Sequence, residues 1–230
     1  QKGAIDKIFK AFEESPEDYH LLYQLPTGGG KTVIFSEIVR QYLKHHKKKV
    51  LVMTHRIELC KQTSNMLTEF EVVNKVIDSK ADLSDQGEYS CFVAMVETLN
   101  NRLTDDKLDI SDIGLVIIDE AHCISEWGHD FRPDYLRIGE LRRALNVPLA
   151  AFTATADEET QAEIINKLFD GQAPASFLHG FDRPNIHLAF AAKDQPRKQV
   201  LAFAAARKGQ SGIVYCGTRA KTETLAQALD

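Results

Sequence analysis

The chain has 230 residues, of which 43% are hydrophobic and 27% are charged. This composition is typical of a globular protein with a packed core, and the length allows one full domain and part of a second. The 28 basic and 33 acidic residues give a net charge of −5, which excludes a globally basic nucleic-acid-binding protein, so any such contact must come from a local patch.

The first residues predict an amphipathic helix, because the apolar side chains of Ala4, Ile5, Ile8, Phe9 and Phe12 recur with helical spacing.

The cysteines indicate no metal site or redox site, since the four of them are far apart and no paired spacing is typical of zinc or a redox dithiol. We expect reduced thiols in a cytoplasmic protein. No apolar run is long enough to cross a membrane and no signal peptide is recognisable, so we expect no membrane association.

The next stretch, residues 25–32, reads Leu-Pro-Thr-Gly-Gly-Gly-Lys-Thr and lies between an apolar run that predicts a strand and a segment with helical spacing. Three glycines allow backbone conformations that a side chain would forbid, so their N–H groups can converge on phosphates at a helix N-terminus. Lys31 would reach the β- and γ-phosphates of ATP, and Thr32 would hold Mg²⁺. The strict phosphate-loop pattern would require a glycine where Leu25 stands, so a glycine-rich turn stays open as the alternative.

Strands and helices then alternate along the chain. The basic run 45–49 is interpreted as a solvated turn. The alternation predicts an α/β fold, a doubly wound, mostly parallel sheet with helices on both faces, whose ligands bind at the carboxyl ends of the strands. The predicted strands are 50–53, 72–77, 91–96, 113–118 and 149–152, and the predicted helices are 57–70 and 99–108.

The aliphatic strand 113–118 ends in Asp119-Glu120-Ala121-His122. A carboxylate at this place lies on the same sheet edge as the phosphate loop, so Asp119 can hold Mg²⁺ and Glu120 can orient and deprotonate the attacking water. This arrangement is typical of ATP hydrolysis, in which the protein mainly positions groups and stabilises charge. An ordinary polar loop after the strand is the alternative.

With these motifs the chain resembles a superfamily-two helicase, in which residues 119–122 are the DEAH-box motif. Residues 123–133, Cys-Ile-Ser-Glu-Trp-Gly-His-Asp-Phe-Arg-Pro, resemble the aromatic-rich loop of the RecQ helicases. Residues 152–156 resemble motif three, residues 181–186 the inter-domain segment and residues 212–220 motif four. The resemblance implies a RecA-like ATP-dependent DNA helicase that moves 3′ to 5′ on single-stranded or forked DNA, with ATP and Mg²⁺, in the cytoplasm or at a bacterial nucleoid.

The aromatic-rich loop has the chemistry of a DNA contact. Trp127 and Phe131 offer flat faces on which a base can stack, at about 1–3 kcal/mol per base, and Arg132 can bind a phosphate. The alternative is that both aromatic side chains anchor the loop in the core.

Further site residues follow from the resemblance. It implies that His122 couples ATP to motif three, where Thr153 and Thr155 end a strand within reach, although a plain structural hydrogen bond stays open. It also implies a set of nucleotide contacts and a set of DNA contacts. The nucleotide contacts are Gln1, which reads adenine, with Thr27, Gly28, Gly29, Gly30, Lys31 and Thr32; the additional DNA contacts are Thr54, Arg56 and Arg219.

The resemblance is uneven. Before Asp119, residues 30–35, 53–59 and 95–99 are closer to restriction-enzyme and repair-type motors, which indicates either a composite of two related motors or a divergent natural sequence. Two further functions stay open: a non-enzymatic nucleotide- or DNA-binding module, and a double-stranded DNA translocase.

We expect two domains, residues 1–180 as a first RecA-like ATP-binding domain and residues 181–230 as a linker and the start of a second. In the second, residues 186–192 and 212–216 predict strands, and residues 195–208 and 218–229 predict helices. The motifs that carry the arginine finger of such motors do not occur in this sequence, and a finger is worth roughly 10³–10⁵ in rate. We therefore expect this chain to hydrolyse ATP slowly and to unwind nothing by itself.

Overall fold

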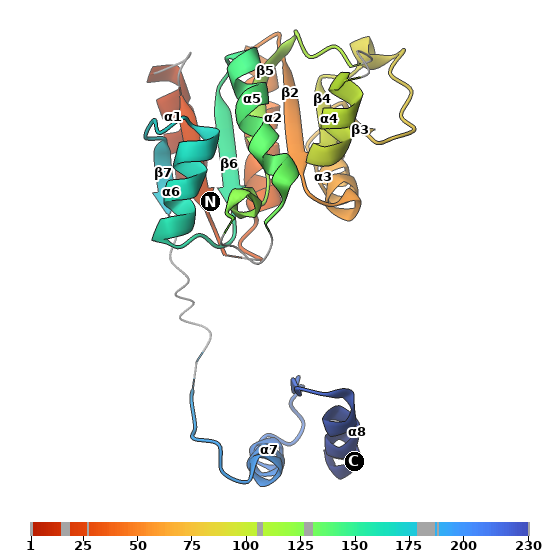
Figure 1. Ribbon diagram of the computed structural model, residues 1–230, viewed down its shortest axis with the longest axis vertical. Helices are drawn as coiled ribbons and strands as arrows, with labels where there is room; N and C mark the ends of the chain where they lie inside the picture. The colour runs from red at the N-terminus through yellow and green to blue at the C-terminus, as the bar shows by residue number, and fades with distance from the viewer. Residues whose placement is uncertain are drawn as a thin grey trace. The chain divides into compact units, whose positions relative to one another are not determined.

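The computed structural model describes residues 2–14, 19–26, 28–104, 108–126, 131–178, 187 and 189–229. Contacts between residues divide the chain into two compact units, Gln1–Asp182 and Arg183–Asp230. Figure 1 shows their helices and strands.

The described part of the first unit is built on one sheet of seven strands in the order β3-β4-β2-β5-β6-β1-β7. Every neighbouring pair is parallel, so the carboxyl ends of all the strands lie along one edge. The strands are β1 (His20–Gln24), β2 (Lys49–Thr54), β3 (Asn74–Ile77), β4 (Cys91–Met95), β5 (Ile113–Ile118), β6 (Leu149–Thr153) and β7 (Ala175–Leu178).

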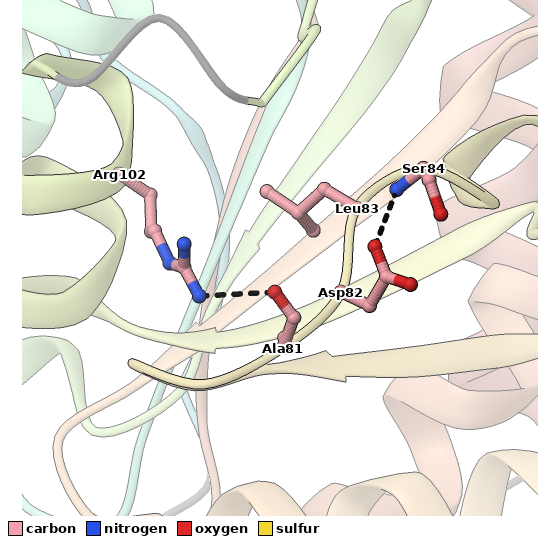
Figure 2. A pocket seen from close by; sticks show the side chains of 5 residues that line it. All are labelled: Ala81, Asp82, Leu83, Ser84 and Arg102. Atoms are coloured by element: carbon pink, nitrogen blue, oxygen red, sulfur yellow. Dashed lines mark hydrogen bonds between the residues drawn. The ribbon is translucent and has the colours of Figure 1, made fainter.

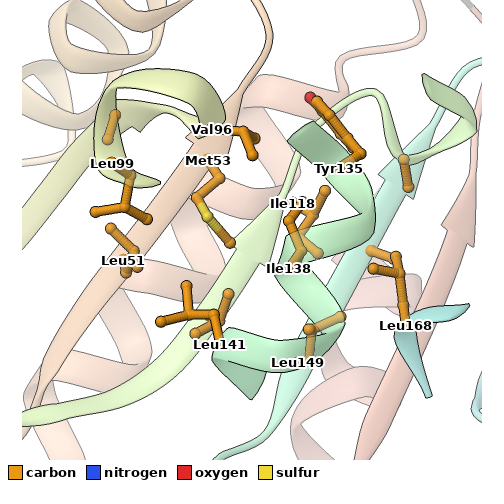
Figure 3. Packing of buried hydrophobic residues seen from close by; sticks show 14 of the residues in the cluster. Leu51, Met53, Val96, Leu99, Ile118, Tyr135, Ile138, Leu141, Leu149 and Leu168 are labelled. Carbon is orange, nitrogen blue, oxygen red and sulfur yellow. The ribbon is translucent and has the colours of Figure 1, made fainter. Parts of the chain in front are cut away.

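Helices cover both faces of this sheet. Successive side chains of a strand point to opposite faces, so in β2 the residues Leu51 and Met53 join one buried cluster while Val50 and Val52 join the other. Figure 1 shows α4, α5 and α6 on the near face, and Figure 3 shows the cluster beneath them. One face carries α1 (Lys2–Glu14), α2 (Lys31–His45) and α3 (Ile57–Glu69), and the other carries α4 (Val96–Thr104), α5 (Leu136–Leu145) and α6 (Glu158–Leu168).

Three short 3₁₀ helices complete this unit, η1 (Gln86–Glu88), η2 (Ala121–Ile124) and η3 (Pro133–Tyr135). The last two flank the loop that follows β5. No helix in the described ranges is both long enough and apolar enough to cross a membrane.

The predicted α/β fold, with a parallel sheet and helices on both faces, is confirmed. The sequence analysis did not include α5, α6 or β7. Both helices bury only a few apolar side chains among many charged ones, and β7 is a four-residue edge strand whose residues alternate between half-buried and exposed. Such elements carry a weak periodic signal.

The second unit contains α7 (Pro196–Ala205) and α8 (Arg219–Leu229), within the two predicted helices. The two predicted strands are wrong, because residues 187, 189–192 and 212–216 form no strand. A strand needs a hydrogen-bonded neighbour, and the described residues of this unit supply none. The apolar side chains of Ile213 and Tyr215 are instead 82% and 90% exposed.

Candidate functional site

The loop between β1 and α2 contains glycines in backbone conformations that other residues rarely adopt. Gly28 and Gly30 have φ angles of +79° and +90°, a region that favours glycine. A Cβ atom on Gly29 would lie 2.6 Å from Leu25 Cγ and 2.9 Å from the Pro26 carbonyl oxygen. Gly30 is the N-cap of α2 and offers no side-chain cap, so the first N–H groups of the helix remain for an anion.

Two hydrogen bonds fix the ends of this loop. The Leu25 N–H donates to the Thr153 carbonyl oxygen of β6 (3.0 Å), and the Ile34 N–H donates to the Gly30 carbonyl oxygen (3.0 Å). The loop is therefore held between the sheet and the first turn of α2.

Asp119 and Glu120 follow β5 at the same sheet edge. The Asp119 N–H donates to the Met53 carbonyl oxygen of β2 (2.8 Å), and the Asp119 carbonyl oxygen accepts from the Tyr135 hydroxyl (3.1 Å). The Glu120 N–H donates to Asp119 Oδ1 (3.0 Å), and Glu120 has a φ of 58°. The backbone that presents both carboxylates is thus tied to β2 and to η3.

Lys31 joins the loop to these carboxylates. Its Nζ donates to Glu120 Oε1 at 2.8 Å and lies 3.9 Å from Asp119 Oδ1. All three side chains are largely buried, and such partly desolvated pairs interact more strongly than exposed ones. The structure therefore brings the predicted lysine, metal ligand and base into one site.

The pKa of the Asp119 carboxyl is raised to about 6, mainly by burial; the Lys31 charge and the Glu120 N–H lower the pKa, and the Glu120 charge adds to the rise. The protein alone therefore compensates this charge incompletely. Mg²⁺ binds oxygen ligands and uses one or two carboxylates together with substrate phosphates. The described residues contain no cluster of three His, Cys, Asp or Glu side chains suited to a metal.

His122 connects the ends of β5 and β6. Its Nδ1 lies 3.0 Å from Thr153 Oγ1 and 3.3 Å from Glu120 Oε2. The Thr153 hydroxyl donates its only hydrogen to the Thr155 carbonyl oxygen (2.9 Å), so it can only accept from His122. This assigns the proton to Nδ1 and makes His122 the donor to Thr153, with Glu120 Oε2 as a close neighbour.

A hollow of about 580 Å³ lies beside this network, lined by residues that follow β2, β5 and β6, among them His55, Arg56, Glu120 and Thr155. Burial, followed by the charges of Arg132 and Arg56, lowers the pKa of His55. Arg132 Nε is buried and has no hydrogen-bond partner among the described residues. Positively charged side chains therefore lie in this region together with the carboxylates of Glu58 and Glu120.

The other predicted DNA contacts differ in accessibility. Phe131 is half-buried, and Arg219, at the start of α8, is exposed and pairs with Glu223 (3.0 Å). Thr54 is fully buried at the end of β2, so its position does not favour a direct contact with DNA. Gln1, Thr27 and Trp127 lie outside the described residues.

A second hollow, of about 430 Å³, lies next to the segment that follows β3 and is lined by residues 81–84 and Arg102 (Figure 2). The Arg102 guanidinium donates to the carbonyl oxygens of Asp78 and Ala81 at 3.0–3.2 Å. The guanidinium N–H groups are used in hydrogen bonds to the backbone, so we assign this hollow no function.

The sequence analysis missed Tyr135, which the structure places against the backbone of Asp119. Its partner is a main-chain oxygen 16 residues earlier, and every residue has such an oxygen, so the sequence carries no signal for the pair. The only hint is that Tyr135 comes two residues after Pro133, the end of the matched loop.

The sequence model of the family described as "Type III restriction enzyme, res subunit" matches residues 1–158. The ATP-dependent DNA helicase RecQ of Pasteurella multocida is 45% identical over 118 residues, which are 51% of this chain and 18% of that protein. RecQ of Haemophilus influenzae is 32% identical over 212 residues, 91% of this chain and 33% of that protein. The probable ATP-dependent DNA helicase RecS of Bacillus subtilis is 35% identical over 214 residues, 88% of this chain and 42% of that protein.

The chain thus spans between 18% and 42% of the length of these relatives. Among solved structures, the Hef helicase domain of Pyrococcus furiosus is similar with a TM-score of 0.57 and 22% identity, over 74% of this chain and 37% of that chain. The UvsW helicase of bacteriophage T4 is similar with a TM-score of 0.53 and 17% identity, over 76% and 58%. These two likenesses confirm the RecA-like fold.

The resemblance to RecQ helicases is confirmed, and the restriction-type character of the first half has its counterpart in the family model. The chain belongs to the family of the type III restriction enzyme res subunit, and it is similar to RecQ-type DNA helicases.

Proposed function

We propose that this chain is part of the motor of an ATP-dependent DNA helicase, which couples ATP hydrolysis to 3′–5′ movement on single-stranded or forked DNA. The observation that best supports the proposal is the contact of Lys31 with Glu120, beside Asp119, at one edge of the sheet. The names of the relatives, ATP-dependent DNA helicases, agree with it.

In the proposed nucleotide site, the N–H groups of the glycine loop and of the first turn of α2 bind the phosphates. Lys31 contacts the β- and γ-phosphates, Gln1 and Thr27 add contacts to the nucleotide, and Thr32 and Asp119 hold Mg²⁺. The metal, when bound, neutralises charge on the phosphate oxygens.

Glu120 acts as the general base. Lys31 donates to its Oε1, and His122 Nδ1 lies 3.3 Å from its Oε2. A γ-phosphate offers Lys31 a more highly charged partner than Glu120 does. Transfer of Lys31 to the phosphate frees Oε1 to accept a proton from the attacking water.

The proposed DNA contacts surround the aromatic-rich loop. Trp127 and Phe131 stack on bases, and Arg132 binds a phosphate. Because the loop continues directly from residues 119–122, DNA binding can reach the ATP site through His122, Thr153 and Thr155. The sequence assigns further DNA contacts to Arg56, Thr54 and Arg219.

The domain assignment belongs to the same proposal. Residues 1–180 form the first RecA-like domain, and residues 181–230 form a linker and the start of a second. The activity of such a motor on DNA implies a cytoplasmic location, at the nucleoid in a bacterium.

The ATP half of the proposal is tested with Glu120→Gln. We expect this variant to keep its affinity for ATP and to lose turnover by a factor of about 10²–10⁴, the usual contribution of a general base. Glu140→Gln is the matched control, because Glu140 is exposed on α5. Unchanged turnover in Glu120→Gln would contradict the role of Glu120 as the base. Turnover in Lys31→Ala equal to that of the parent would contradict the proposed ATP site.

The DNA half is tested by measuring the affinity for single-stranded DNA at several salt concentrations. Loss of one phosphate contact in Arg132→Ala should reduce the slope of log affinity against log salt by about 1. Trp127→Ala should weaken binding with little change of slope, because stacking releases no counterions. Lys47→Ala is the control, since Lys47 is exposed before the amino end of β2, at the opposite sheet edge. An unchanged slope in Arg132→Ala would contradict the phosphate contact.

A further inference from the structure

The peptide unit that joins Asp119 to Glu120 is held at both of its polar groups. Its carbonyl oxygen accepts from the Tyr135 hydroxyl at 3.1 Å, and its N–H donates to Asp119 Oδ1 at 3.0 Å. A peptide unit is planar, so fixing both groups fixes the backbone angles on either side.

This constraint explains the conformation of Glu120. Its φ of 58° and ψ of 46° lie in the left-handed region, which is uncommon for a residue with a side chain and persists only when the surroundings hold it. The direction of the Glu120 side chain follows from this backbone, and the side chain then meets Lys31 at 2.8 Å and His122 at 3.3 Å.

Tyr135 is itself firmly placed. It is 1% exposed and belongs to the buried cluster that contains Ile118 and Ile138 (Figure 3). Burial raises the pKa of the Tyr135 hydroxyl well above its usual value, so the hydroxyl stays protonated and remains a donor. Its only possible role toward a carbonyl oxygen is donation.

Tyr135 also connects to the loop in which DNA contacts are expected. The Arg132 N–H donates to the Cys123 carbonyl oxygen (2.8 Å), which closes the base of the loop, and the Tyr135 N–H donates to the Arg132 carbonyl oxygen (3.0 Å). A displacement of Arg132 therefore acts on Tyr135 and, through the hydroxyl, on the Asp119–Glu120 peptide.

We propose that Tyr135 is a positioning residue, whose hydroxyl holds the Asp119–Glu120 peptide so that the Glu120 carboxylate faces the nucleotide site, and which links the base of loop 123–132 to that carboxylate. The inference rests on the proposed role of Glu120 as the base in ATP hydrolysis. Its structural part, the orientation of Glu120, is independent of that role.

The test compares Tyr135→Phe with Tyr42→Phe. Each substitution removes one buried hydroxyl and keeps the ring, and Tyr42 belongs to the cluster on the opposite face of the sheet. In a crystal structure of Tyr135→Phe we expect Glu120 to leave the left-handed region and to lose its contact with Lys31. We expect kcat for ATP to fall about tenfold with KM changed less than about twofold, and acceleration by single-stranded DNA to be lost. Tyr42→Phe should change none of these.

Two results would overturn the inference. One is a Tyr135→Phe structure in which Glu120 keeps its conformation and its contact with Lys31. The other is a kcat equal to that of Tyr42→Phe in a protein whose parent turns over ATP. If the parent binds no ATP, the proposed function fails, and the crystal structures still decide whether Tyr135 positions Glu120. Should Tyr135→Phe not fold, Tyr135→Met, which is smaller than tyrosine and also lacks a hydroxyl, takes its place.

Discussion

The buried carboxylate of Asp119 lowers the stability of the fold when it is ionised. It is 4% exposed, and burial raises its pKa from the usual 3.8 to about 6. Between these two values the folded chain binds a proton that the unfolded chain releases, so stability falls as the pH rises through this window and the full cost is present above pH 6. A residue that is unfavourable in the fold and lies beside a phosphate loop is typical of a functional site.

We therefore predict that Asp119→Asn is more stable than the parent at pH 7.5. The shift from 3.8 to about 6 corresponds to roughly 3 kcal/mol at that pH and to about half as much at pH 5. The amide retains an oxygen for the Glu120 N–H. Denaturant unfolding at both pH values measures the difference.

The control for this prediction is Asp6→Asn, because Asp6 is exposed on α1 and an exposed carboxylate makes no comparable contribution. The raised pKa would be contradicted if Asp119→Asn and the parent had the same free energy of unfolding at pH 7.5. It would also be contradicted if the two free energies differed more at pH 5 than at pH 7.5. The same variant should lose ATP turnover, so stability and activity change in opposite directions at one residue.

Single residues differ in how far the sequence predicts them. Lys31, Asp119 and Glu120 follow from motifs, and the structure places them within hydrogen-bonding or ion-pairing reach. The expected contact of His122 with Thr153 is also present at 3.0 Å. Tyr135 could not be predicted, because a hydrogen bond to a backbone oxygen requires no particular residue at the other end.

Among the elements, the phosphate loop shows most directly how sequence determines geometry. An added Cβ on Gly29 would meet the backbone of the loop itself, because it would lie 2.9 Å from the Pro26 carbonyl oxygen as well as 2.6 Å from Leu25 Cγ. The Gly29 N–H donates to the same Pro26 oxygen at 2.9 Å. Any relief of the clash therefore moves the loop.

We predict that Gly29→Ala weakens nucleotide binding by about tenfold or more, because the displaced N–H groups no longer converge on the phosphates. The matched control is Gly87→Ala, in η1, where an added Cβ has no atom within 4 Å. Titration with a fluorescent ATP analogue measures both. Equal affinities in the two variants would show that the loop does not bind the phosphates in this conformation.

The sequence predicted buried helices and strands better than half-buried ones. All six residues of β5 are buried, and the corresponding aliphatic run gave its bounds without error. The edge strand β7 and the charged helices α5 and α6 were missed because a half-buried element has few apolar positions. The segments 189–192 and 212–216 show the opposite case. Their apolar runs predict strands, but these residues form none, because the described residues of their unit provide no neighbouring strand.

At the scale of the whole molecule, the two units differ in what they bury. Both hydrophobic clusters and every strand in the described ranges belong to Gln1–Asp182. In Arg183–Asp230 the described helices have no buried residue, and Phe190, Ile213 and Tyr215 are exposed. The cooperative core of this chain is therefore the core of the first unit.

This division predicts the behaviour of a chain shortened to residues 1–182. Since hydrophobic burial is the main favourable term in folding, the shortened chain should unfold with a midpoint within about 2 °C of that of the full chain. It should also keep its affinity for ATP, because the described residues of the nucleotide site are all in the first unit. Binding of the dye ANS should fall, because exposed apolar side chains such as Phe190 and Tyr215 are removed. A midpoint lowered by about 5 °C or more would show that residues 183–230 contribute to the core, and the independence of the first unit would then be wrong.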